Sequence, residues 1–212
     1  MLMRTERYRR LLAAAGLLAF AWQPALCEAA ESGEAAVRRL LSTNSCPGCD
    51  LSGMDLSGIN LLGADLQGAT LREAKLENAA ITGANLRAAD MSRAKLNHSI
   101  LGGADMTDAV LTGATLKGAF LTLSRMVHAR LDGANLMLAH MDSANLDGAS
   151  LVGTDLREAD LYNARLFFAN LTNARLQGAN LNAADFGEAE LDGALTNPDT
   201  VCPDRSQGPC EW

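Results

Sequence analysis

Residues 61–76 read LLGADLQGATLREAKL, and in this stretch an apolar residue recurs at every fifth position. The same spacing continues without a slip from Leu51 to Leu191, through 29 positions. The residue two positions before a centre is usually small, and this series is Ala at 24 of its 30 positions between Cys49 and Ala194. The residue between the two is most often Asp or Asn. The chain is therefore dominated by one five-residue repeat.

A period of five fits neither regular secondary structure. On an α-helix, five residues advance by about 500°, so the centres would drift around the cylinder. On a flat strand, an odd period would place successive centres on opposite faces. The Ala-polar-Leu triplet itself alternates as a strand does, so the chain must turn once in every repeat to keep all centres inward. Gly, which favours turns, occupies 13 of the 29 positions that lie two residues after a centre.

The repeated A-(D/N)-L-x-x signature resembles the pentapeptide-repeat family, and it covers about residues 46–195. The resemblance implies an all-β fold, a right-handed quadrilateral parallel β-helix in which four repeats make one coil. The 29 centres then predict about seven coils. Stacked coils of this kind bury one continuous column of Leu and Ala. The low aromatic content, 4% against 48% hydrophobic residues, agrees with such a narrow core.

The N-terminus is typical of an export signal. Several Arg residues precede an apolar run from Leu11 to Trp22, which is too short to span a bilayer. We expect residues 1–27 to be a signal peptide, cleaved after Cys27 or after Ala29. A lipoprotein signal at Cys27 is disfavoured by the bulky Leu26, and a membrane-anchoring or buried helix is the other alternative. The expected localisation is the periplasm or the exterior of a bacterium.

The remaining chain is acidic. Removing residues 1–27 takes away four Arg and one Glu and leaves a net charge of −10. We therefore expect no nucleic-acid partner, because nucleic-acid binding depends on a basic surface. We also expect no contact with a membrane once the signal has been removed.

Non-repeat sequence lies at both ends of the array. Residues 28–45 are expected to cap the first coil, with a short helix over residues 35–41, and residues 196–212 are expected to cap the last. Four cysteines lie at these ends, and an even number in an exported chain suggests disulfides: Cys46, Cys49, Cys202 and Cys210. Similar family members suggest that the segment from Cys202 to Cys210 is a closed terminal loop. A CxxC redox site at Cys46 and Cys49 is the alternative, although no thioredoxin-like βαβ pattern surrounds it.

No catalytic, cofactor or metal site is expected. The interior is filled by Leu and Ala and leaves no room for a small-molecule pocket. With four repeats per coil, His98, His128 and His140 fall on three different faces, whereas a metal site needs ligands that converge.

One face of the predicted coil is unusually apolar. Its only outward charges are Asp142 and Asp160, and Ile100, Phe120 and His140 are expected to stack on consecutive coils. Contiguous apolar surface suggests a contact site. The candidate residues on this face and the next are Leu62, Ile100, Phe120, Leu123, His140, Tyr162, Phe167 and Phe168.

These features predict a non-catalytic, exported scaffold or binding solenoid, whose partner is an unidentified protein or a second copy. Some pentapeptide-repeat proteins mimic DNA and act on type II topoisomerases, which makes a DNA mimic the first alternative. That role needs a strongly acidic face, whereas acids and bases are mixed here. A thiol-redox accessory role for Cys46 and Cys49 is the second alternative.

Overall fold

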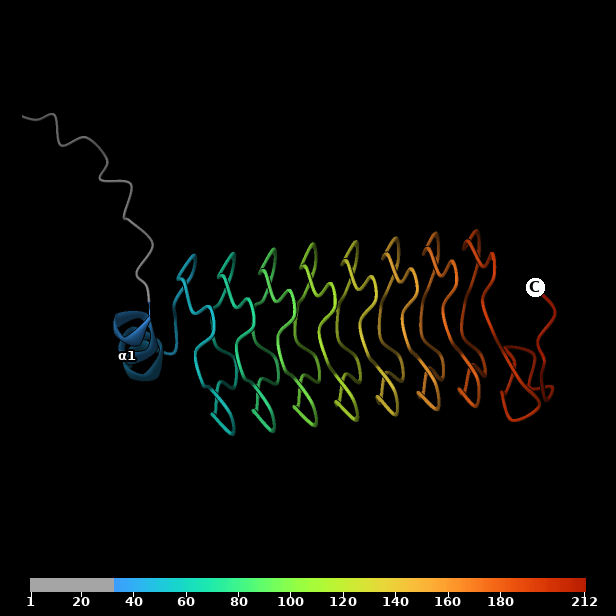
Figure 1. Ribbon diagram of the computed structural model, residues 1–212, viewed down its shortest axis with the longest axis horizontal. Helices are drawn as coiled ribbons and strands as arrows, with labels where there is room; N and C mark the ends of the chain where they lie inside the picture. Colours follow the sequence, from blue (N-terminus) through green and yellow to red (C-terminus); the bar gives the residue numbers. More distant parts are fainter. Residues whose placement is uncertain (1–32) are drawn as a thin grey trace, which may run out of the picture.

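The computed structural model describes residues 33–212 of the chain. The expected signal peptide and its cleavage sites lie outside the described residues. The described chain begins with helix α1, Glu34–Thr43, continues as a long rod of stacked coils, and ends in the irregular segment 196–212 (Figure 1). Within residues 33–212, no helix is both long and apolar enough to cross a bilayer.

Each coil contains 20 residues. Parallel bridges join residue i to residue i+20, from Ser45 with Asp65 up to Arg175 with Leu195. Four repeats therefore complete one turn of the rod, and each repeat forms one side. Only the residue before each centre is bridged, so the sides are isolated bridges and not extended strands. The number of coils, expected to be about seven, stays a prediction.

The core is a column of centres and small residues. Every centre from Leu51 to Leu181 is buried, and nearly all the Ala residues two positions earlier are buried beside them. Leu and Ala alternate with outward residues on each side, so a coil of this width has no interior space left for larger side chains.

Four of the five backbone N–H groups of a repeat donate hydrogen bonds to backbone carbonyls, three of them to neighbouring coils. Around Leu111, the centre donates its N–H to Arg130 of the next coil (2.7 Å), and Val110 donates to Ala89 of the preceding coil (2.9 Å). Gly113 donates to Asp132 of the next coil, and Ala114 closes the turn on Leu111. The fifth donor, the N–H directly after the centre, has no backbone acceptor in this pattern.

Side chains of Asp and Asn accept many of these remaining donors. In 14 repeats, the Asp or Asn before the centre accepts the N–H two residues later, as Asp105 does from Thr107 (3.0 Å). The recurring Asp and Asn thus belong to the turn as Asx hydrogen-bond acceptors.

Each turn also needs a residue with left-handed backbone. All 29 residues located two positions after a centre have positive φ, although only 13 of them are Gly. The other 16 include Leu123 (φ 58°) and Phe168 (φ 57°), which are uncommon in this region. The repetition of coils therefore imposes a backbone conformation that the local sequence does not favour.

Helix α1 covers the first coil and includes residues 35–41, which were expected to be helical. Its Ala36 and Leu40 are buried. Asn44 ends the helix in a left-handed conformation and donates its side-chain amide to the carbonyl of Leu62 (2.9 Å). The carbonyl of Asn44 accepts the N–H of Asp65 (3.0 Å), so this residue connects the helix to the first ladder.

Candidate binding surface

Three outward side chains form an apolar ladder near the middle of the rod. Ile100, Phe120 and His140 occupy the bridged slot of one side on consecutive coils. The rings of Phe120 and His140 are stacked, with centroids 4.7 Å apart and an interplanar angle of 7°. Phe120 remains 44% exposed, so the stack presents its outer surface to solvent. We call these three residues the aromatic ladder.

The other candidate residues do not all join this ladder. Leu123, 67% exposed, lies at the adjoining corner of the same coil as Phe120. Tyr162 lies at that corner two coils later, beyond Asp142, and Leu62 lies two coils before Ile100, so both stand apart along the rod.

Phe167 and Phe168 form a separate apolar pair. Their rings are in T-shaped contact at 4.3 Å, at the far corner of the next side. A Cβ on Gly187, one coil further, would lie 2.6 Å from the Phe167 ring, so the glycine leaves room for it. This pair is close to the C-terminal end of the rod and is not part of the aromatic ladder.

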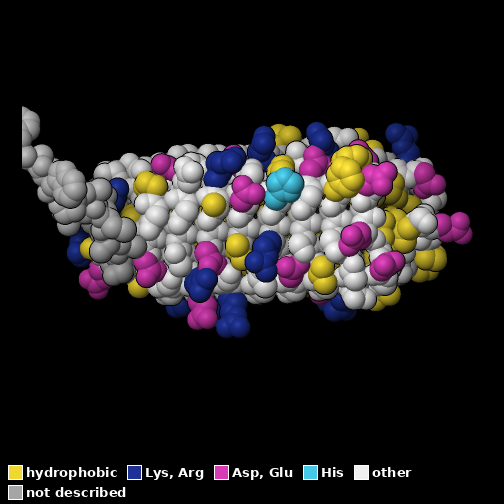
Figure 2. Space-filling model, turned by 90° about the horizontal axis from the view of Figure 1, so that it is seen from above, with side chains coloured by type: hydrophobic (Ala, Val, Ile, Leu, Met, Phe, Trp, Pro, Cys, Tyr) yellow, Lys and Arg dark blue, Asp and Glu magenta, His cyan; other side chains and the backbone are white. Residues whose placement is uncertain are grey.

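Acidic and basic side chains form ion pairs along the middle of the rod. Asp105 and Arg125 share a ladder, but Asp105 forms its ion pair with Arg87 (3.2 Å), while Arg125 donates to the hydroxyl of Thr107 (3.2 Å). Pairs such as Arg165 with Asp147 (2.6 Å) repeat this diagonal geometry across a corner. Figure 2 shows Lys, Arg, Asp and Glu side chains interspersed along the side of the rod that it presents.

The turn hydrogen bonds set the ionisation of several carboxylates. Partial burial of Asp105 raises its pKa, but hydrogen bonds from Thr107 and from Arg87 outweigh this effect and hold the pKa below the usual value. Asp155 has a lowered pKa chiefly because Arg157 donates to it. These acids are engaged in turns and ion pairs and are not arranged as proton donors.

A few hydroxyl groups interrupt the small-residue column. Ser99 donates to the carbonyl of Leu96 (2.7 Å), and Thr154 donates to the carbonyl of Leu131 (2.9 Å). The buried hydroxyl of Ser124 has no partner among the residues that the structure describes. Because backbone carbonyls accept hydrogen bonds from the hydroxyl groups of Ser99 and Thr154, these residues can replace Ala in the core at little cost in stability.

The three histidines are dispersed. His98 and His128 lie at two different corners, where their rings pack over Gly118 and Gly148, and His140 belongs to the aromatic ladder. In the described part of the chain, no three His, Cys, Asp or Glu side chains gather as metal ligands would.

The four cysteines within residues 33–212 lie in two pairs at disulfide distance, Cys46 with Cys49 and Cys202 with Cys210. Both sulfurs of the first pair are buried beneath α1, and Cys46 points its Sγ toward the carbonyl of Ala36 (3.5 Å).

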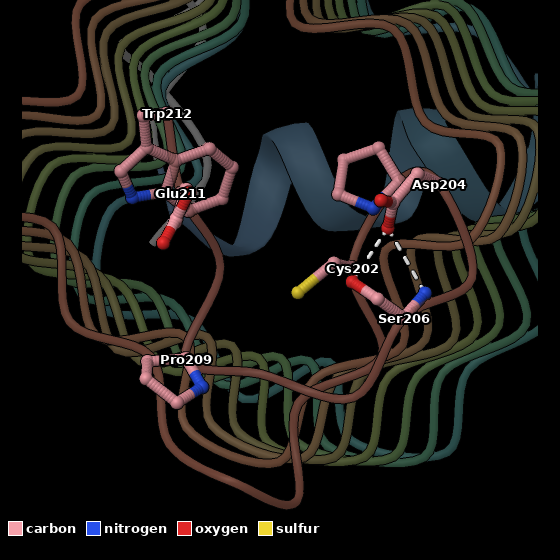
Figure 3. Close-up of a pocket in the computed structure, with 7 residues that line it drawn as sticks. Cys202, Asp204, Ser206, Pro209, Glu211 and Trp212 are labelled. Atoms are coloured by element: carbon pink, nitrogen blue, oxygen red, sulfur yellow. Dashed lines mark hydrogen bonds between the residues drawn. The ribbon is translucent and has the colours of Figure 1, made fainter.

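The C-terminal segment leaves an open depression at the end of the rod. Figure 3 shows Glu211 and Trp212 on one side of it, and Cys202, Asp204 and Ser206 on the other. Asp204 accepts hydrogen bonds from the N–H and the hydroxyl of Ser206, which lower its pKa. Asp204 and Ser206 are thus hydrogen-bonded to each other within the loop.

Comparison with known proteins identifies the repeat. The family model described as pentapeptide repeats matches eight copies, over residues 48–87, 89–126, 125–158 and 159–195. Comparison with curated proteins gives no match.

Several solved structures are similar to this chain, among them HetL, QnrB1 and Rfr23. The first is HetL from the cyanobacterium Nostoc sp. strain PCC 7120, a pentapeptide repeat protein involved in heterocyst differentiation regulation. It has 26% identity over 84% of this chain and 99% of HetL, with a TM-score of 0.35. QnrB1, a plasmid-mediated fluoroquinolone resistance protein, has 17% identity over 70% of this chain and 89% of its own, with a TM-score of 0.41. Rfr23 from Cyanothece 51142 has 25% identity over 79% of this chain and 97% of its own, with a TM-score of 0.29.

The family match spans most of the described rod and follows the repeat that the bridges define. Pentapeptide-repeat proteins fold as right-handed quadrilateral β-helices, as the resemblance of the repeat implied. The chain therefore belongs to the pentapeptide-repeat family.

Proposed function

We propose that this chain is an exported, non-catalytic solenoid that binds a protein partner through the aromatic ladder and the adjoining Leu123. The observation that carries the proposal is the stacked, exposed Phe120–His140 pair with Ile100 below it. Aromatic side chains supply rigid contact area and are enriched where proteins bind each other.

The absence of catalysis is part of the proposal and rests on the packing. Every centre from Leu51 to Leu181 is buried in a column of Leu and Ala, and many of the outward acids, such as Asp105, are held in turns and ion pairs. An enzyme needs a concave site with converging groups, and a filled rod offers flat sides instead.

The two alternatives find less support. A DNA mimic needs an uncompensated acidic face, whereas Arg87, Arg157 and Arg165 each pair with a nearby Asp. A redox accessory needs an accessible sulfur, whereas Cys46 and Cys49 are buried.

Site-specific photocrosslinking in the native cell tests the binding surface. With the photoreactive residue at Phe120 or Leu123, we expect one crosslinked product of fixed mass. The control is Arg130, which is also exposed and occupies the same bridged slot on the opposite side of the rod. Equal yields from Phe120 and Arg130 would contradict a specific surface. With the partner identified, Phe120→Ala is expected to weaken binding by about tenfold or more, since aromatic anchors dominate interfaces.

Export is tested by fractionation and mass spectrometry of the native chain. We expect a periplasmic or secreted product that begins at Glu28 or Ala30 and carries both cysteine pairs as disulfides, because such compartments are oxidising. Denatured, unreduced protein should then bind no thiol-alkylating reagent. A full-length cytoplasmic chain with alkylatable cysteines would contradict export and restore the topoisomerase alternative.

A further inference from the structure

The last coil ends in backbone that is unpaired on two of its four sides. In earlier coils, a centre donates its N–H to the next coil, as Leu166 does to Asp185 (2.8 Å). Among the centre and corner N–H groups from Leu51 to Gly193, those without an acceptor are the N–H groups of Phe186, Glu188, Leu191 and Gly193. We call this segment, residues 184–193, the open edge.

The C-terminal segment completes the other two sides. Leu176 donates to Leu195 (2.7 Å) and Leu181 donates to Val201 (2.8 Å), so residues 195–201 replace the next coil there. The chain then turns back through its terminal loop (Figure 3) and gives no hydrogen bond to the open edge. The chain's own C-terminal segment therefore caps two sides of the last coil by hydrogen bonds. The other two sides keep unpaired backbone groups to which another strand could bind.

The core is also incompletely covered at the open edge. Phe186 and Leu191 are the only centres between Leu51 and Leu191 that are half-buried instead of buried. The ring of Trp212 lies beside Phe186, with centroids 5.4 Å apart, and is itself 49% exposed. The Phe167–Phe168 pair lies one coil below, against Gly187. Apolar surface and free main-chain donors thus coincide.

The charge of this end is strongly acidic. Residues 184–212 contain seven acids and a single base, Arg205. Glu188, Glu190 and Asp192 are exposed on the open edge itself. Figure 2 shows Asp and Glu side chains gathered toward the C-terminal end of the rod, in contrast to the mixed charges of its middle.

We propose that the open edge binds an extended, cationic segment of another polypeptide, which adds as the next rung of the ladder. The centre and corner N–H groups of the open edge donate hydrogen bonds to its carbonyls, as in β-augmentation of an edge strand. Its apolar side chains cover Phe186 and Leu191, and its Lys or Arg side chains face Glu188, Glu190 and Asp192. A second copy of this chain is a poorer occupant, because two acidic ends would face each other.

Binding of designed peptides to the purified chain tests the proposal. The probe is a short, blocked peptide in which Lys and Val alternate, labelled for fluorescence anisotropy. It is compared with a Glu–Val peptide and with a Lys–Val peptide whose backbone nitrogens are methylated. We expect binding of the unmethylated Lys–Val peptide alone, weakened by salt. Equal binding of the methylated peptide would overturn main-chain pairing, since a rung also donates N–H groups to the coil below it, as Glu190 does to Ala169 (2.9 Å), and a methylated nitrogen cannot.

Matched variants locate the binding site. Neutralising the edge with Glu188→Gln, Glu190→Gln and Asp192→Asn is expected to weaken Lys–Val binding by about tenfold. The control removes three exposed acids elsewhere with Glu73→Gln, Asp108→Asn and Glu158→Gln; Asp108 occupies the same corner position as Glu188, four coils earlier. The control should leave binding within about twofold. Equal losses in the two variants would show that only net charge matters and would overturn the proposal.

Hydrogen exchange gives a readout that charge alone does not change. With saturating Lys–Val peptide, exchange of the amides of Phe186, Glu188, Leu191 and Gly193 should slow by about tenfold or more, because they become paired. Failure of the peptide to bind would mean that the acids of the open edge serve only to keep other strands from pairing with it. A dimer of the chain through this end would make a second copy the occupant. Either result overturns the proposal. The open edge is separate from the aromatic ladder, so the two proposals can fail independently.

Discussion

Replacing Leu111 with Asp is expected to abolish cooperative folding of the rod. Leu111 is fully buried in the central part of the column. The substitution loses about 2–3 kcal/mol of apolar burial and places a carboxylate without partners in a dry interior, which costs several kcal/mol more. The total is comparable to the whole stability of a typical domain, about 5–15 kcal/mol. Circular dichroism during thermal unfolding should show no cooperative transition.

The matched control is Thr115→Asp, in which the same carboxylate enters the next repeat at the bridged, outward slot. This slot holds Asp in many repeats, and here its ladder neighbours are Lys95 and Asn135. We expect the free energy of unfolding to change by no more than about 0.5 kcal/mol. A cooperative, wild-type-like transition for Leu111→Asp would mean that the centres do not form a dry core.

Replacing Gly103 with Ala is expected to destabilise the rod by about 1–2 kcal/mol, because an L-residue in left-handed backbone is strained. Gly103 has φ 64°, and a Cβ there would meet no atom within 4 Å, so backbone strain is the only cost. Leu123 occupies the same corner one coil later with φ 58°, and Leu123→Gly should relieve a similar strain and stabilise by about 1 kcal/mol. Urea unfolding measures both changes.

The adjacent Gly102 supplies the control. Its φ lies outside the left-handed region, and a Cβ there would make only an ordinary contact with the carbonyl of Thr122 at 3.6 Å. Gly102→Ala should therefore be neutral or slightly stabilising. Equal destabilisation by the two Gly→Ala substitutions would argue against left-handed strain as the cause.

Much of the candidate surface followed from the register. A spacing of five, with four repeats per coil, places residues 20 apart above one another, and this is sufficient to stack Ile100, Phe120 and His140. The same rule could not separate Leu62 or the Phe167–Phe168 pair from the aromatic ladder, because it treats outward positions as faces and ignores corners and distance along the rod.

The spacing of the repeats also could not predict which charged side chains form ion pairs. Asp105 and Arg125 are ladder neighbours, yet Asp105 pairs with Arg87, 18 residues before it, across a corner. Long Arg side chains lean diagonally, and the hydroxyl of Thr107 competes for Arg125. Such choices depend on side-chain direction, which a repeat pattern does not contain.

The sequence by itself determined the periodic part of this protein: the β-helix, the inward Leu and Ala, and the outward polar slot. The reason is that 29 identical spacings leave one geometry in which every centre is buried. Only the tertiary structure decided the aperiodic part. Sixteen residues other than Gly adopt left-handed turns because neighbouring coils hold them there. The open edge exists because residues 196–212 cover two sides of the last coil and turn away from the other two. Neither the left-handed turns nor the open edge can be predicted from the local sequence, because both depend on contacts with the neighbouring coil.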